Sequence, residues 1–94
     1  MFKKLLFGHG VKNGSGISIK FKGLHNIEYR EGDKILIAFR ERLVGDPATD
    51  IDSASIASWE PPFDKQPLAE AKKREILENI CKAADVLGIT YVIR

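Results

Sequence analysis

The amino-acid sequence predicts an α+β fold in which an antiparallel β-meander packs against one long C-terminal helix, followed by a short terminal strand. Three features carry this prediction. The first half of the chain alternates apolar and polar side chains in segments joined by short turns. A helical period of apolar residues follows between residues 67 and 87. The last segment, residues 89–93, is rich in β-branched side chains, which favour a strand.

Three consecutive strands form the predicted meander. Residues 17–22 alternate strictly between apolar and polar side chains, and residues 25–30 alternate again, with His25 on the apolar face. A hairpin turn at Glu31-Gly32-Asp33 leads into a third strand, residues 34–43. Because both faces of this strand are apolar in its first half, we expect that half to be central in the sheet.

Turn-forming and strand-ending residues set the remaining connections. Residues 8–16 contain four glycines and predict a turn-rich link. Residues 45–50 predict a loop, because Asp46-Pro47 disfavours both helix and mid-strand geometry. Residues 56–59 predict a short strand that Pro61-Pro62 ends, since proline cannot donate to a sheet.

The predicted helix runs from Pro67 to Leu87. Proline suits the first helical turn, and Gly88 suits the left-handed position that closes a helix. The apolar face would consist of Ile76, Leu77, Ile80, Cys81, Ala84 and Leu87.

The composition indicates one domain covering residues 1–94. A chain of 94 residues that is 44% hydrophobic and 30% charged can build one modest core but not two. The longest apolar run, residues 35–39, is far shorter than the roughly 20 residues that span a bilayer, so we expect no membrane segment. Residues 1–7 imitate the start of a signal peptide, but Gly8 ends the apolar part, and we interpret them as part of the fold.

The single cysteine indicates the redox state of the cellular compartment in which the protein works. One cysteine cannot form an internal disulfide, and Cys81 falls on or beside the apolar face of the predicted helix. A buried free thiol is typical of a protein in a reducing compartment. The sequence therefore predicts a cytoplasmic protein.

The net charge of +2 hides an uneven distribution along the chain. Residues 1–44 carry nine Lys or Arg against four Asp or Glu, and residues 65–94 carry six against four. Residues 45–64 carry five acidic side chains and no basic one. These acids are Asp46, Asp50, Asp52, Glu60 and Asp64. An acidic segment therefore lies between two basic ones.

No motif for catalysis or cofactor binding is present. The glycine-rich link lacks the Gly-Lys-Ser/Thr ending of a phosphate cradle, and a strand rather than a helix follows it. Asp46, Asp50 and Asp52 do not have calcium-loop spacing, and no histidine or cysteine joins them for zinc. His25 fits a partly buried structural position and His9 an exposed loop. We therefore expect no enzyme activity, cofactor, metal or small-molecule substrate.

Two surfaces remain as candidates for binding. The acidic segment is either an ordinary solvated loop or a surface for a protein partner. Trp59 either anchors the turn before the helix or is exposed as an interface residue. The alternative is a small nucleic-acid-binding module that uses basic strand faces. Its residues would be Lys20, Lys22, Arg30, Lys34, Arg40 and Arg42, but polar residues, not stacking aromatics, are interleaved with them.

The order of several segments resembles the small immunity proteins of bacterial polymorphic-toxin and contact-dependent growth inhibition systems. The likeness covers mainly residues 24–93 and includes the hairpin at residues 27–33. Its sharpest element is the sequence Trp59-Glu60-Pro61-Pro62 before a helix that contains residues 75–80 and ends near Gly88. The resemblance implies a non-enzymatic protein that binds a cognate toxin domain, often a nuclease, and blocks its active site or substrate path.

Charge complementarity agrees with this reading. A nuclease binds a polyanion, so an acidic patch on its inhibitor would speed association. The expected partner-binding residues are Asp46, Asp50, Asp52, Trp59 and Glu60. The expected partner is the cognate toxin domain rather than nucleic acid, a membrane or a small molecule.

Overall fold

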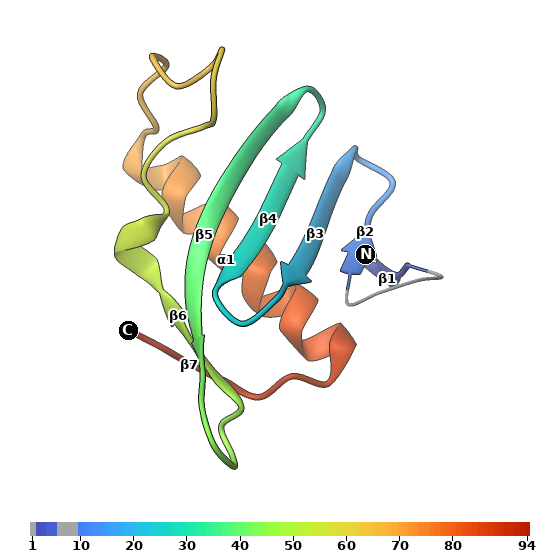
Figure 1. Cartoon of the computed structure of the whole chain (residues 1–94). Coiled ribbons are helices and arrows are strands. Elements are labelled where there is room, and N and C mark those ends of the chain that lie inside the picture. Colours follow the sequence, from blue (N-terminus) through green and yellow to red (C-terminus); the bar gives the residue numbers. More distant parts are fainter. Residues whose placement is uncertain (1, 6–9) are drawn as a thin grey trace.

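The computed structural model describes residues 2–5 and 10–94 and confirms the α+β prediction (Figure 1). Its elements are β1 (Lys3–Lys4), β2 (Gly10–Lys12), β3 (Ile17–Lys22), β4 (Asn26–Glu31), β5 (Lys34–Arg42), β6 (Thr49–Asp52), the 3₁₀ helix η1 (Ser53–Ser55), α1 (Glu70–Leu87) and β7 (Tyr91–Ile93). Within these residues the strands form one sheet in sequence order. Neighbouring strands are antiparallel from β1 to β6, whereas β6 and β7 are parallel.

The meander agrees closely with the sequence prediction. β3 has the predicted bounds, and β5 ends one residue before the predicted end. β4 begins at Asn26, so His25 belongs to the preceding turn and is exposed. The prediction of a partly buried His25 was therefore wrong, because the alternating pattern begins one residue before strand pairing does.

Three predicted connections differ from the structure. The predicted loop at residues 45–50 is shorter, because Thr49 and Asp50 begin β6. Residues 56–59 are not a strand; they run along the edge of β5, where the Glu60 backbone N–H donates to the Ile35 carbonyl oxygen at 2.7 Å. The link at residues 8–16 contains β2 in its described part. His9, for which we expected exposure, lies outside the described residues.

The helix starts later than predicted and ends where predicted. Ala69 is the N-cap residue, and its methyl side chain makes no capping hydrogen bond. Gly88 adopts the left-handed conformation with φ of 72°, which glycine reaches without steric cost. The Ile89 N–H donates to the Ala84 carbonyl oxygen at 2.9 Å and satisfies one of the helix's terminal carbonyls.

α1 covers one face of the sheet and lies behind it in Figure 1. The buried residues of α1 are Ile76, Ile80, Ala83 and Ala84. The sheet contributes mainly Val11, Ile19, Phe21, Ile27, Tyr29, Leu36, Ala38 and Ile51. Phe2, just before β1, is also buried, so this part of the N-terminal segment belongs to the fold as expected. No helix among the described residues is long and apolar enough to cross a membrane.

Candidate functional site

The second face of the sheet is left uncovered by the described elements. We call it the outer face, and Figure 1 views the sheet from this side. Directly paired residues on neighbouring strands point to the same face, so the register gives its composition. Three rows cross it: Lys12, Ser18, Arg30 and Ile35; Gly10, Lys20, Glu28 and Ile37; and Lys22, Asn26, Phe39 and Asp52. Each row passes from basic or polar residues to an apolar residue on β5.

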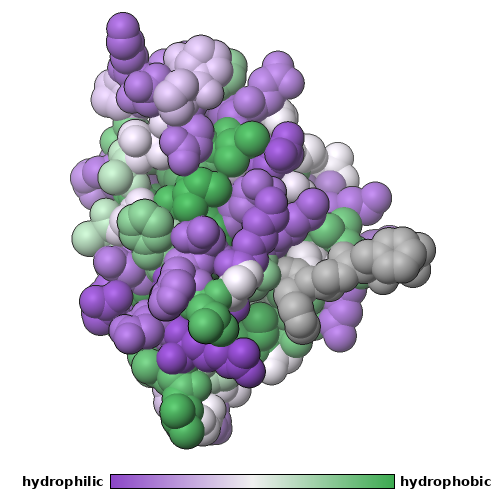
Figure 2. All heavy atoms as spheres, viewed as in Figure 1, coloured by the Kyte–Doolittle hydropathy of each residue, from purple (hydrophilic) through white to green (hydrophobic). Residues whose placement is uncertain are grey.

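The apolar residues of these rows form a stripe along β5. We call Ile35, Ile37 and Phe39 the β5 stripe. The Phe39 side chain is 53% exposed, and both isoleucines are half-buried. In Figure 2, hydrophobic atoms lie over β5 among the hydrophilic atoms of the neighbouring strands. An exposed aromatic ring within an apolar stripe and a polar surround is typical of a protein-binding surface.

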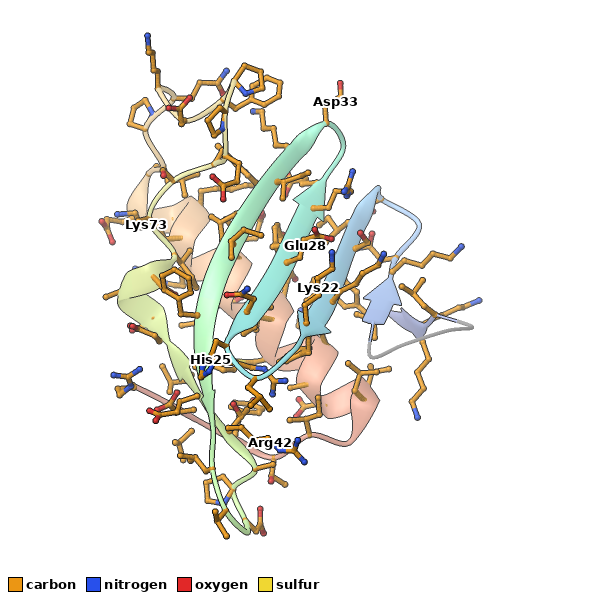
Figure 3. The ribbon with its side chains drawn as sticks, viewed as in Figure 1. Lys22, His25, Glu28, Asp33, Arg42 and Lys73 are labelled. Atoms are coloured by element: carbon orange, nitrogen blue, oxygen red, sulfur yellow. The ribbon has the colours of Figure 1, made fainter. Side chains whose placement is uncertain are left out.

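A basic border lies on one side of the β5 stripe, over β2, β3 and β4. Its residues are Lys12, Lys20, Lys22 and Arg30, and all four are exposed. Lys22 and Glu28 point toward one another, with the Lys22 Nζ atom 3.0 Å from the Glu28 Oε1 atom (Figure 3). The other three make no ion pair with a described acidic residue. Their charge is therefore available to a partner.

An acidic border lies on the other side of the stripe and consists of Glu41, Asp50 and Asp52, of which the two aspartates are predicted site residues. Asp50 is only 7% exposed; its Oδ1 atom accepts a hydrogen bond from the Glu41 N–H at 2.8 Å. The Nε atom of Arg94 lies 3.1 Å from the second oxygen of Asp50. Asp52 accepts a hydrogen bond from the Ala54 N–H at 3.1 Å and lies 3.8 Å from the Arg94 guanidinium. Both carboxylates therefore also hold the local fold, and Arg94 offsets part of their charge.

The structure separates the other two predicted acids. Asp46 is exposed in the turn between β5 and β6, whereas Glu60 is exposed beside Ile35 at the opposite end of β5. Arg42 lies seven positions after Ile35 along β5, which corresponds to a rise of roughly 23 Å. The five predicted site residues therefore do not form one patch. Asp50 and Asp52 lie together, and Asp46 and Glu60 lie at the two ends of the strand.

Trp59 occupies the anchoring position that was one of its two predicted roles. Its side chain is 3% exposed, and its ring centroid lies 6.3 Å from that of Tyr29. The Nζ atom of Lys34 lies 5.7 Å from the ring centroid of Trp59, which adds a cation–π contact. The ring therefore fastens the segment before the helix to the inner face of the sheet.

The six basic residues of the nucleic-acid alternative do not share a face. Lys20, Lys22 and Arg30 lie on the outer face. Lys34, Arg40 and Arg42 lie on the face that α1 packs against, because Arg40 is paired with the fully buried Ile51. A single positive platform built from all six is therefore excluded by the register.

The residues considered for chemistry remain apart. His25 is exposed in a turn, and Cys81 is half-buried on α1. Burial raises the pKa of the Cys81 thiol, which disfavours the reactive thiolate. No group of three or more His, Cys, Asp or Glu residues in the described part of the chain is placed to hold a metal ion.

Sequence reasoning missed the β5 stripe as a binding surface. The signal was the apolar run at residues 35–39, which is apolar on both faces of a strand. We interpreted it as the mark of a central strand, and β5 does lie between β4 and β6. The helix covers only one face, so the outward side chains of the same run stay accessible.

An α+β sheet with one packed face and one open face, divided into basic, apolar and acidic zones, is typical of a small protein that binds another macromolecule. The family comparison makes this class specific. The model of the family described as Immunity protein 74 matches residues 23–94, so the chain belongs to this family. The match includes the β5 stripe and the acidic border and confirms the resemblance to immunity proteins. The comparisons with curated proteins and with solved structures found no match.

Proposed function

We propose that this chain is a non-enzymatic, cytoplasmic immunity protein that neutralises a cognate toxin domain by direct contact through its outer face. The toxin would belong to a bacterial polymorphic-toxin or contact-dependent growth inhibition system. Membership of the Immunity protein 74 family supports the class. The β5 stripe is the observation that supports the surface, because it combines an aromatic ring that is 53% exposed with two half-buried aliphatic neighbours.

The three zones of the outer face have different roles in this proposal. The β5 stripe supplies the apolar anchor, since buried aromatic residues carry much of the binding energy of interfaces. The charged borders orient the partner, because charge complementarity acts mainly on specificity and association rate. Asp50 and Asp52 belong to the acidic border, whereas Asp46 and Glu60 lie outside it, at the two ends of β5. Trp59 supports the surface from the inner side of the sheet.

The acidic border favours a nuclease as the toxin. A nuclease has a basic groove for its polyanionic substrate, and an acidic inhibitor surface complements such a groove. The three acids Glu41, Asp50 and Asp52 lie close together along paired positions of β5 and β6. In this proposal the acidic border faces the substrate groove, and bound inhibitor blocks access of the nucleic acid.

Binding to the toxin domain encoded immediately upstream tests the proposal directly. We expect the two proteins to copurify and the chain to protect cells that express the toxin. Phe39→Ala should weaken binding at least tenfold, because a central aromatic hot spot contributes about 2 kcal/mol or more. The matched control is Val86→Ala on α1, where a 36% exposed apolar side chain lies away from the outer face.

Two outcomes would overturn parts of this proposal. Absence of both binding and protection would refute the assigned function. Equal binding by Phe39→Ala and the control would remove the outer face as the interface. Retention on heparin that falls steeply with salt would instead support the nucleic-acid alternative.

A further inference from the structure

A pocket of about 340 Å³ lies at the end of the sheet, on the side of α1. It is open to solvent and is lined by the turn after β3, the last part of β5, the β5–β6 turn and the residue that follows Gly88. Phe21, Leu24 and Ile89 give it apolar walls, whereas Arg40 and Arg42 enter it from β5. Arg40 is half-buried and Arg42 is exposed, and two cationic side chains beside apolar walls favour an anionic occupant.

Arg40 is held in place but incompletely satisfied. Its Nη2 atom donates to the Gly23 carbonyl oxygen at 2.6 Å, and its guanidinium lies over the Phe21 ring at 5.2 Å from the centroid. Its Nε atom is buried and has no hydrogen-bond partner among the described residues. A buried unsatisfied donor costs about 1–3 kcal/mol, so an acceptor at this point would stabilise the arrangement.

Arg42 adds a second positive charge on the same face of β5. Neither arginine forms an ion pair with a described acidic residue. Burial, with a smaller contribution from Arg42, lowers the pKa of Arg40. An anion between the two guanidinium groups would relieve this repulsion and replace lost solvation.

We propose that this pocket binds the carboxylate of an Asp or Glu side chain that the toxin domain inserts between Arg40 and Arg42. The inference rests on the proposed function and adds one contact beyond the outer face: a toxin domain bound there would reach past the end of β5 to place one side chain in this pocket. A planar carboxylate matches the geometry of a guanidinium group. Its two oxygens can accept hydrogen bonds from the Nε–H and from a neighbouring N–H of the same guanidinium. Phe21 and Leu24 would contact the methylene groups of the inserted side chain. Leu24 is 50% exposed and lies at the rim.

The surroundings favour an isolated carboxylate over the phosphates of a nucleic acid. A nucleic-acid chain needs a continuous basic track, whereas this pocket is walled by apolar side chains. Asp46 also lies in the turn that contributes Ala48 to the pocket lining, and it would repel a polyphosphate backbone. A single side chain on a protein loop enters without bringing further negative charge along the surface.

The chemistry of the pocket can be tested on the full chain without the toxin. Sodium acetate is titrated at constant ionic strength while the Nε–H signal of Arg40 is followed by NMR. We expect a saturable shift with acetate that Arg42→Met reduces at least threefold, while Lys82→Met, an exposed charge removal on α1, leaves it unchanged. No saturable shift would overturn the pocket, and a stronger response to inorganic phosphate than to acetate would reassign it.

The second measurement uses the toxin domain itself. Arg42→Met and Arg40→Met should each weaken binding at least tenfold, and Lys82→Met should not. Arg42→Met is the decisive variant if Arg40→Met unfolds, because no hydrogen bond within the described residues depends on the Arg42 side chain. Unchanged affinity for Arg42→Met would overturn the inference while leaving the proposed function intact. Failure of the unmodified chain to bind the toxin would refute the proposed function, and the acetate titration would still decide the pocket.

Discussion

The side-chain amide of Asn79 on α1 donates a hydrogen bond to the hydroxyl of Tyr29 on β4, with 3.0 Å between Nδ2 and the phenolic oxygen. The Tyr29 hydroxyl lies 3.4 Å from a carboxylate oxygen of Glu31, which in turn pairs with Lys72 at 2.9 Å. These contacts join the central strand of the meander to the helix. They provide polar partners at the edge of a largely apolar interface and help to fix the register between sheet and helix.

Removing the hydrogen bond between Asn79 and Tyr29 should reduce stability without disrupting the fold. Tyr29→Phe deletes the hydroxyl and leaves the Asn79 amide without its partner, so we expect a loss of about 1–2 kcal/mol in the free energy of unfolding. Asn79→Ala should cost a similar amount, and the double variant less than the sum. Urea denaturation of the four proteins measures the coupling. Strict additivity would show that the two side chains do not act together.

Alkaline pH should weaken the protein through Tyr29. Burial, followed by the nearby Glu31 carboxylate, raises the pKa of Tyr29 from 10.0 to about 12 against the opposing hydrogen bond from Asn79. Because the folded pKa is the higher one, the contribution is complete below pH 10 and is lost as the pH rises toward 12. Urea unfolding between pH 9 and 11.5 should show a shallower decline for Tyr29→Phe. Parallel declines would contradict the assignment.

The same substitution should destabilise the protein at Asp50 but have little effect at Asp46. Asp50→Asn weakens the contact with Arg94 and the hydrogen bond from Glu41, so we expect a loss of about 1–3 kcal/mol. Asp46→Asn changes an exposed turn residue and should stay within about 0.5 kcal/mol of the unmodified chain. Thermal unfolding of the two variants measures the difference. Equal effects would mean that Asp50 has no structural role.

The association rate with the toxin should depend on the acidic border. Asp46→Lys and Asp52→Lys should slow association at low salt, and the difference should shrink as ionic strength rises, because steering by surface charge is screened. Stopped-flow measurements at two salt concentrations test this, with Lys82→Glu on α1 as the charge-changing control. A rate that neither substitution changes would exclude a role in encounter both for Asp52 of the acidic border and for Asp46 in the β5–β6 turn.

The helix start offers a stabilising substitution. Ala69 has the extended backbone of an N-cap residue, with φ of −68° and ψ of 153°, but its side chain cannot accept a hydrogen bond. Ala69→Asp or Ala69→Ser should supply that acceptor and raise the free energy of unfolding by about 0.5–2 kcal/mol. Thermal denaturation measures the gain, and Ala71→Ser, two residues further along the helix, serves as the control. A gain of the same size at residue 71 would exclude capping as the cause.

The parts of the fold that were predictable from sequence are those with strong local patterns. The alternation in residues 17–22 defines β3, and the glycine after Leu87 defines the helix end. β6 was missed because Ile51 is its only apolar residue, and the strand depends on pairing with β5 and β7 on either side. Residues 56–59 look like a strand locally, but Ile56 and Trp59 are both buried, and a strand would turn two residues three apart to opposite faces.

The candidate site was less predictable for a related reason. A count of acidic residues along the chain cannot reveal that Arg94, 44 residues after Asp50, forms an ion pair with it and offsets part of its charge. The same count cannot show that Asp46 and Glu60 lie at opposite ends of β5. The apolar run at residues 35–39 was visible, but which of its two faces the helix covers is a property of the tertiary structure.

The sequential order of the sheet also affects how the chain is made. Each strand from β2 to β6 pairs with the strand before it, so the meander can assemble hairpin by hairpin as it leaves the ribosome. The residues of α1 that cover its inner face, Ile76 to Ala84, are synthesised only after β6. Until then the nascent sheet exposes apolar side chains on both faces, and it is during this interval that the chain is most vulnerable to aggregation and most dependent on chaperones.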